Sequence, residues 1–307
     1  MNLDIFKEKK ILVIGDVGID HYIHGTSSRL CPEAPVPVFT PTKQEYRLGL
    51  AANVTANIVS LGGQVKLCSL AGADNTSDIL NNLLRQHNIE QLTWDLLDRR
   101  TTRKIRYYID KHMLLRVDEE ETNSFNPDIM TKFTYAVCKQ IKEWADFVVI
   151  QDYGKGLITP VLVDAINQCG KPVLVDPSPK QNPMTYYGVT YIKPNKKEYE
   201  DQFEKHNYSQ HSLMDHLSIK GLIVTEGSNG MTIYEDSNQY HLDAIKKDVI
   251  DVCGAGDTVT AALALSLASG MNLVNSTNIA NLAAGIVVSK FGTSVVLLEE
   301  LKEVYDK

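Results

Sequence analysis

The sequence lacks the features of membrane, secreted and nucleic-acid-binding proteins. No apolar run approaches the length that crosses a bilayer, and the opening segment MNLDIFKEKK does not have the layout of a signal peptide. The 5 cysteines form no CxxC pair, which is typical of reduced thiols in the cytoplasm. Acidic residues outnumber basic ones, 38 to 31, and the net charge of -7 argues against a nucleic-acid partner. We therefore expect a cytoplasmic protein that binds neither membranes nor nucleic acid.

Several nucleotide-binding motifs are also absent. No G-x-x-x-x-G-K-[ST] occurs, which excludes a P-loop enzyme, and no H-R-D or D-F-G set occurs, which excludes a protein kinase. Residues 254–259 lack the third glycine of a dinucleotide fingerprint, so a Rossmann oxidoreductase is a poor interpretation. Any nucleotide chemistry must therefore use a different loop.

Short apolar runs alternate with helical patterns along most of the 307 residues. The runs predict strands at 11–14, 65–70, 147–150, 172–176, 190–193 and 222–225. Apolar spacing predicts helices at 50–61, 78–86, 257–269 and 276–291. This alternation favours a three-layer α/β/α fold with a mostly parallel central sheet, built as one domain over residues 1–307.

Two segments do not fit the parallel pattern. Residues 21–39 contain three prolines, which predicts an irregular loop with an exposed edge strand. Residues 101–118 alternate between apolar and polar side chains over two runs, which predicts a β-hairpin with one solvent-exposed face. We expect these segments to form a small β lid, from about 16–47 and 100–118, that protrudes from the main body.

The segment DVCGAGD at 251–257 carries the strongest chemical signal. Gly254, Ala255 and Gly256 can present backbone amides to an anion at a helix start, as a transferred phosphoryl group requires. Asp257 would repel an anion and makes sense as the general base that accepts a proton from an attacking hydroxyl. The alternative is an ordinary strand-to-helix turn whose aspartate stabilises the helix dipole.

Further polar residues recur just beyond the predicted strands, where ligands bind in parallel α/β sheets. They suit sugar hydroxyls or magnesium-bound water, although each one alone is also a normal helix cap. These residues are Asp16, Asp20, Asp152, Asp176, and Asn195 with Glu198.

Four cations lie on two segments that suit a phosphate group on the substrate. Lys155 stands between two glycines just past a predicted strand, and Lys104, Arg106 and Arg116 lie on the hairpin. The alternative is a solvated strand face.

On these residues the sequence resembles the ribokinase-like (PfkB) sugar kinases over nearly its whole length. The resemblance implies ATP and Mg²⁺ as cofactors, Asp257 as the base, and Glu198 and Asn195 near magnesium and phosphates. It implies a sugar site that includes Asp16, Asp20, Gly49, Asn53, Arg106, Asp152 and Lys155. It implies an ATP side that includes Asn195, Thr225, Gly227, Gly230 and Asn281. The motifs that carry it are GAGD at 254–257, N-x-x-E at 195–198, Gly15-Asp16 with Asp20, and Gly49–Asn53.

Within that family the sequence is most similar to the heptose 7-phosphate kinases of lipopolysaccharide precursor synthesis. The similarity rests on SRLCPEAPVPV at 28–38, DYGKG at 152–156 and NLAAGIVVSKFGT at 281–293. It implies D-glycero-D-manno-heptose 7-phosphate as substrate, phosphorylated at the anomeric hydroxyl on the way to ADP-heptose, and a homodimer through the β lid. Many such kinases are fused to a nucleotidyltransferase domain, and this chain resembles the stand-alone kinase or an isolated kinase domain.

Three positions depart from the family pattern. Leu50 replaces the second glycine before Ala51, Cys253 replaces a threonine, and the order DPSPK at 176–180 displaces the lysine. We expect the Leu50 side chain to turn into the core, because burial is the commoner fate of leucine. The alternative is that it intrudes on the sugar site and weakens sugar binding. Two alternatives to a heptose kinase remain: a kinase of the same fold for another sugar or a nucleoside, and a weakly active sugar-phosphate-binding protein.

Overall fold

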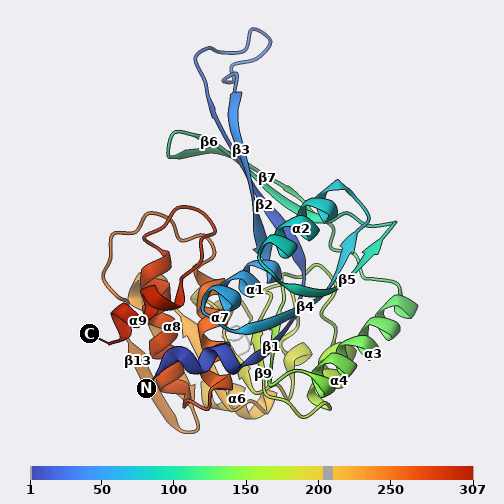
Figure 1. Cartoon of the computed structure of the whole chain (residues 1–307), viewed down its shortest axis with the longest axis vertical. Helices are drawn as coiled ribbons and strands as arrows, with labels where there is room; N and C mark the ends of the chain where they lie inside the picture. Colours follow the sequence, from blue (N-terminus) through green and yellow to red (C-terminus); the bar gives the residue numbers. More distant parts are fainter. Residues whose placement is uncertain (1, 203–209, 307) are drawn as a thin grey trace.

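Two β-sheets of different size organise this computed structural model, which describes residues 2–202 and 210–306 (Figure 1). The larger sheet has nine strands in the order β13-β12-β11-β10-β9-β8-β1-β4-β5. Pairing is parallel from β5 through to β11 and antiparallel for β12 and β13. Its strands are β1 (Lys10–Gly15), β4 (Gln64–Gly72), β5 (Glu90–Leu96), β8 (Phe147–Gln151), β9 (Val173–Asp176), β10 (Tyr191–Ile192), β11 (Gly221–Thr225), β12 (Met231–Glu235) and β13 (Asn238–Leu242).

Helices cover both faces of this sheet, because successive residues of a strand point to opposite sides. Ile11 and Val13 of β1 pack on one side with α1, α2, α7 and α8, whereas Leu12 and Ile14 pack on the other with α3, α4 and α6. The three-layer α/β fold expected from the sequence is confirmed. The helices are η1 (Leu3–Glu8), α1 (Ala51–Ser60), α2 (Asn75–Gln86), α3 (Pro127–Glu143), α4 (Pro160–Asn167), η2 (Pro183–Tyr186), α5 (Lys196–Gln202), α6 (Gln210–Leu217), η4 (Gly227–Asn229), α7 (Ala255–Ala268), α8 (Leu273–Val287) and α9 (Leu298–Tyr305).

A separate four-stranded sheet rises from the main body (Figure 1). Its order is β3-β2-β6-β7, from β2 (Val17–Thr26), β3 (Thr40–Leu50), β6 (Thr102–Ile109) and β7 (His112–Glu119). The hairpin expected at 101–118 is present as β6 and β7. The expectation of loop and exposed edge strand over 21–39 is wrong for its first part, because β2 is an interior strand and is buried from Val17 to Ile23.

Three strands of the large sheet have no counterpart among the sequence predictions: β5, β12 and β13. β5 has no fully buried residue and lies at one edge, and the β12–β13 hairpin forms the other edge. β5 and β13 are mostly polar, and β12, although mostly buried, has Thr232 and Glu235 within MTIYE, so these strands lack the continuous apolar run that revealed the central strands. In the two described stretches of the chain, no helix is both long and apolar enough to span a membrane.

Candidate active site

Neighbouring strands of the large sheet bring polar residues to the same edge. Asp16 directly follows β1, and Asp152 directly follows β8, its neighbour in the sheet. Asp176 ends β9, and Asn195 lies shortly after β10. The carboxyl ends of parallel strands form the ligand-binding edge of such sheets, so these residues surround one candidate site.

Asp257 lies in the first turn of α7 and is almost fully buried. The Asn53 side-chain amide donates to its Oδ2 at 2.7 Å, and the Tyr153 hydroxyl donates to its Oδ1 at 2.7 Å. Burial raises the pKa of Asp257 to about 6, while these two hydrogen bonds limit the rise. The carboxylate is therefore held in place and has a pKa suited to accepting a proton near neutral pH.

The turn before Asp257 opens α7 with a left-handed glycine. Gly254 has φ 79°, and a side chain there would meet the Asn53 amide at 2.9 Å. A Cβ at Gly256 would meet no atom within 4 Å, so the turn is open on that side. The Ala255 amide donates to the Val252 carbonyl at 3.2 Å, so in this conformation it points to the protein's own backbone. The open helix start can offer amides to an anion.

Asp16 and Asp152 hold the DYGKG segment. Asp16 Oδ2 accepts from the Tyr153 and Lys155 amides at 3.0 and 3.1 Å. Asp152 accepts from the Gly154 amide at 2.7 Å and from the Tyr186 hydroxyl at 2.9 Å. Burial and the charge of Asp16 raise the pKa of Asp152 to about 7. The two carboxylates thus position Tyr153 and Lys155, a role that sequence reasoning did not assign.

Asp20 and Arg106 place the second sheet over the same site. Arg106 donates to Asp20 at 2.6 Å and lies 3.6 Å from the Cys253 sulfur. A Cβ at Gly49 would lie 3.3 Å from the Asp20 carboxyl carbon, so glycine allows the two strands to approach. Lys155 pairs with Glu120 at 2.5 Å. Two of the four cations proposed from sequence for a sugar phosphate, Arg106 and Lys155, therefore already have carboxylate partners.

Asn195 and Glu198 form a reciprocal helix cap. The Asn195 amide donates to Glu198 Oε2 at 2.8 Å, and the Glu198 amide donates to Asn195 Oδ1 at 2.9 Å. Burial and the charge of Asp176 raise the pKa of Glu198 to about 7. Asp176 pairs with Lys193 at 3.1 Å, and sequence reasoning did not consider this lysine.

The donor set around Glu198 can be tested for magnesium. No group of three His, Cys, Asp or Glu side chains suited to a metal is found in residues 2–202 and 210–306. Mg²⁺ in phosphoryl-transfer enzymes usually binds through one or two carboxylates and the substrate's phosphates. The Glu198 carboxylate, with that of Asp176 close enough to perturb it, fits this pattern.

The predicted ATP-side residues fall into two groups. Thr225 pairs with Asn195 in a short parallel bridge, and its amide donates to Pro194. Gly227 has φ 59° with open space around it, and Gly230 has φ 94° and contacts the segment after β13 so closely that no Cβ fits. Asn281 on α8 donates to the Asp243 carbonyl at 2.8 Å and fixes the same segment.

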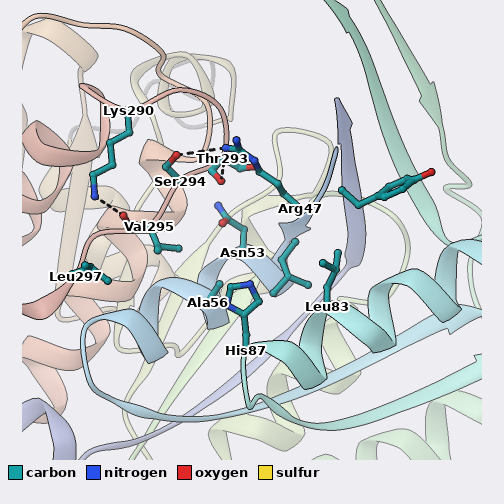
Figure 2. Close-up of a pocket in the computed structure, with 12 residues that line it drawn as sticks. Arg47, Asn53, Ala56, Leu83, His87, Lys290, Thr293, Ser294, Val295 and Leu297 are labelled. Carbon is teal, nitrogen blue, oxygen red and sulfur yellow. Dashed lines mark hydrogen bonds between the residues drawn. The ribbon is translucent and has the colours of Figure 1, made fainter. Parts of the chain in front are cut away.

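A cavity of about 450 Å³ flanks the site and is lined by residues of β3, α1 and α2 and of the segment 290–297 (Figure 2). Among its lining residues, Asn53 lies just below Arg47 and the Thr293–Ser294 segment in this view. Arg47 donates to the carbonyls of Phe291 and Thr293 at 2.8 and 3.3 Å. Arg47 therefore links β3 to the segment around Thr293, which packs against Gly254.

Comparison with solved structures defines the fold class. Escherichia coli phosphofructokinase-2, solved with potassium, matches with a TM-score of 0.81 at 18% identity, over 97% of this chain and 98% of that one. Arabidopsis thaliana ribokinase, solved with ribose and ATP, matches with a TM-score of 0.74 at 16% identity, over 97% and 99%. The fold is therefore ribokinase-like.

Sequence comparison then gives the family. The family model described as pfkB family carbohydrate kinase matches residues 8–300, and the chain belongs to this family of ATP-dependent carbohydrate kinases. The bifunctional protein HldE of Caulobacter vibrioides is 38% identical over 312 residues, which cover 96% of this chain and 63% of that protein. HldE of Haemophilus influenzae strain PittEE is 38% identical over 308 residues, covering 97% and 63%. The chain thus spans less than two thirds of the length of these relatives.

Proposed function

We propose that this kinase transfers the terminal phosphate of ATP to the anomeric hydroxyl of D-glycero-D-manno-heptose 7-phosphate, giving the 1,7-bisphosphate in the cytoplasm. The observation that carries the phosphoryl chemistry is the buried Asp257 carboxylate, fixed by Asn53 and Tyr153 at the open start of α7. The heptose assignment is supported by the segments at 28–38, 152–156 and 281–293 and by the similarity to HldE proteins.

In this mechanism Asp257 accepts the proton as the anomeric oxygen attacks the γ-phosphorus of ATP. The bond from phosphorus to the leaving ADP oxygen breaks, and the negative charge on the transferred group is stabilised by the helix start at Gly254, Ala255 and Gly256. The Ala255 amide must exchange its Val252 carbonyl for the phosphoryl oxygen. Asn53 keeps the base oriented during this step.

The remaining residues have proposed binding roles on either side of Asp257. Glu198 would hold Mg²⁺, which supplies neutralisation of phosphate charge when it is bound. The sugar side is formed by Asp16, Asp20, Gly49, Asn53, Arg106, Asp152 and Lys155. The nucleotide side is formed by Asn195, Thr225, Gly227, Gly230 and Asn281.

An ATP-consumption assay over a panel of sugar phosphates, free sugars and nucleosides tests this function. We expect the heptose 7-phosphate to have the highest kcat/KM, and Asp257→Asn to keep ATP binding but lose about 10²-fold or more in kcat. A preference for an unphosphorylated sugar or a nucleoside would favour the alternative kinase. Binding of sugar phosphate with no turnover of ATP would favour the weakly active alternative.

A further inference from the structure

Charged side chains on one face of the second sheet are arranged in rows across its strands. The register places Asp20 of β2 and Asp118 of β7 on either side of Lys104 of β6. The next row on this face places Arg106 beside Arg116. Each carboxylate therefore has two nearby cations with which it can pair.

The arginines occupy both carboxylates. Arg106 donates to Asp20 at 2.6 Å, and Arg116 donates to Asp118 at 2.7 Å through both its Nε and its Nη2. Planar guanidinium groups match a carboxylate better than an ammonium does, which favours this pairing. Lys104 has no ion pair with any residue of the described ranges.

Lys104 instead lies over the ring of Tyr153, with its ammonium 5.0 Å from the ring centroid. The hydroxyl of that ring donates to Asp257, so a single aromatic side chain separates Lys104 from the proposed base. Burial lowers the pKa of Lys104, although the nearby charges of Asp20, Asp257 and Asp118 act in the opposite direction. A substrate anion bound at this point would give the Lys104 ammonium the ion pair that it lacks.

We propose that Lys104 is the specificity-determining residue that binds the phosphate already carried by the sugar substrate. The inference rests on the proposed function and deepens it, because it assigns this role to Lys104 rather than to the paired cations Arg106 and Lys155. Charge-assisted hydrogen bonds to a phosphate dianion are about twice as strong as neutral ones. A sugar without the phosphate forms none of them.

Lys104→Met tests the assignment by kinetics on matched substrates. KM should rise about 10- to 100-fold for heptose 7-phosphate, the range that one charge-assisted contact of about 1.5–3 kcal/mol gives. KM for ATP, and KM for heptose without the phosphate, should change by less than about threefold. Lys104→Arg, which keeps the charge, should retain most of the preference for the phosphorylated sugar.

Arg103→Met is the matched control. Arg103 is the adjacent residue on the opposite face of β6, where it pairs with Glu119 at 2.8 Å, so the substitution removes the same charge from the same strand. It should leave all three KM values within about twofold. Melting temperatures of the variants establish that each is folded, and calorimetric binding of heptose 7-phosphate without ATP gives a second measurement of affinity.

Equal effects of Lys104→Met and Arg103→Met would overturn the proposal, as would a loss in kcat that is the same for phosphorylated and free sugar. Failure of the proposed function has a different signature, since wild-type enzyme would then not turn over heptose 7-phosphate. In that case the same comparison is made with the best sugar phosphate of the panel. If wild-type enzyme prefers free sugars throughout, Lys104 does not have this role.

Discussion

Asp257 and Tyr153 give the first prediction at the scale of single residues. The base must be ionised to accept a proton, so kcat/KM should fall below the pKa of about 6, by up to tenfold per pH unit. The Tyr153 hydroxyl lowers that pKa, so Tyr153→Phe should move the acidic limb of the pH–rate profile to higher pH by about one pH unit.

A pH–rate profile of the two enzymes makes this measurement. Tyr191→Phe is the control, because it removes a tyrosine hydroxyl from β10 at a residue for which the structure gives no contact with Asp257. Superimposable profiles for wild type and Tyr153→Phe would show that Tyr153 does not act on the base.

Leu50 gives a second prediction, because two opposing effects meet at one residue. Its side chain is buried, as expected from the sequence, but its backbone has φ 57°, a value that suits glycine. Leu50→Ala loses packing and keeps the strain, whereas Leu50→Gly loses packing and relieves it. Leu50→Gly should therefore be more stable than Leu50→Ala by about 1 kcal/mol in free energy of unfolding, with both below wild type.

Denaturant unfolding of matched variants at Leu48 provides the comparison. Leu48 is also buried on β3 and is not among the residues with positive φ, so alanine should be better tolerated than glycine there, by about 0.5–1 kcal/mol. The same order at both positions would contradict the argument from strain.

At the scale of elements, the start of α5 joins a structural role to a proposed metal role. Glu198 caps the helix through Oε2, and glutamine can accept the same hydrogen bond without the charge. Glu198→Gln should therefore keep the melting temperature but raise the Mg²⁺ concentration needed for half-maximal activity several-fold. Glu198→Ala should also lower the stability, by about 1 kcal/mol.

Titration of activity against Mg²⁺, beside thermal melts, separates these effects. An unchanged Mg²⁺ requirement in Glu198→Gln would restrict Glu198 to the helix cap.

The elements also show what sequence patterns can and cannot reveal. β1 and β8 were predictable because both faces are covered, so their residues form continuous apolar runs. β2 was missed because its buried positions include Asp20 and His21, whose partners lie on other strands. His21 stacks on Tyr46 of β3 with ring centroids 4.3 Å apart, and a local sequence pattern cannot predict such a contact between two strands.

In the candidate site, too, local motifs could be predicted from the sequence but contacts between distant residues could not. Asp257 was identified because the GAGD turn is a local signal, but its contact with Tyr153 joins residues 104 positions apart. The four cations were visible in the sequence as well. Only the strand register separates Lys104 from Arg106 and Arg116, since pairing depends on neighbours across strands.

At the scale of the whole molecule, the second sheet carries an exposed apolar surface on its edge strand. Met113, Leu114 and Leu115 of β7 are each between 43% and 54% exposed, and an uncovered edge of this kind favours pairing with another chain. We propose that two copies associate through this sheet, with closure over the sugar excluding water.

Leu115→Asp should therefore shift the protein from dimer to monomer in light scattering, with its melting temperature measured in parallel. Val161→Asp is the control, because Val161 is 75% exposed on α4 of the main body. A monomeric and fully active wild type would remove the basis for this interface.

Two of the four connections between the second sheet and the main body have almost no intervening residues, whereas residues 97–101 and 120–126 form longer loops. Asp16 alone joins β1 to β2, and β3 runs into α1 with no intervening residue, three positions before Asn53. Any rotation of the second sheet must therefore also move Asp16 and the start of α1, the helix that carries Asn53. For protein engineering this means that the sheet cannot be exchanged between relatives as a loop-bounded module. A functional graft would have to carry the end of β1 and the first turn of α1 with it.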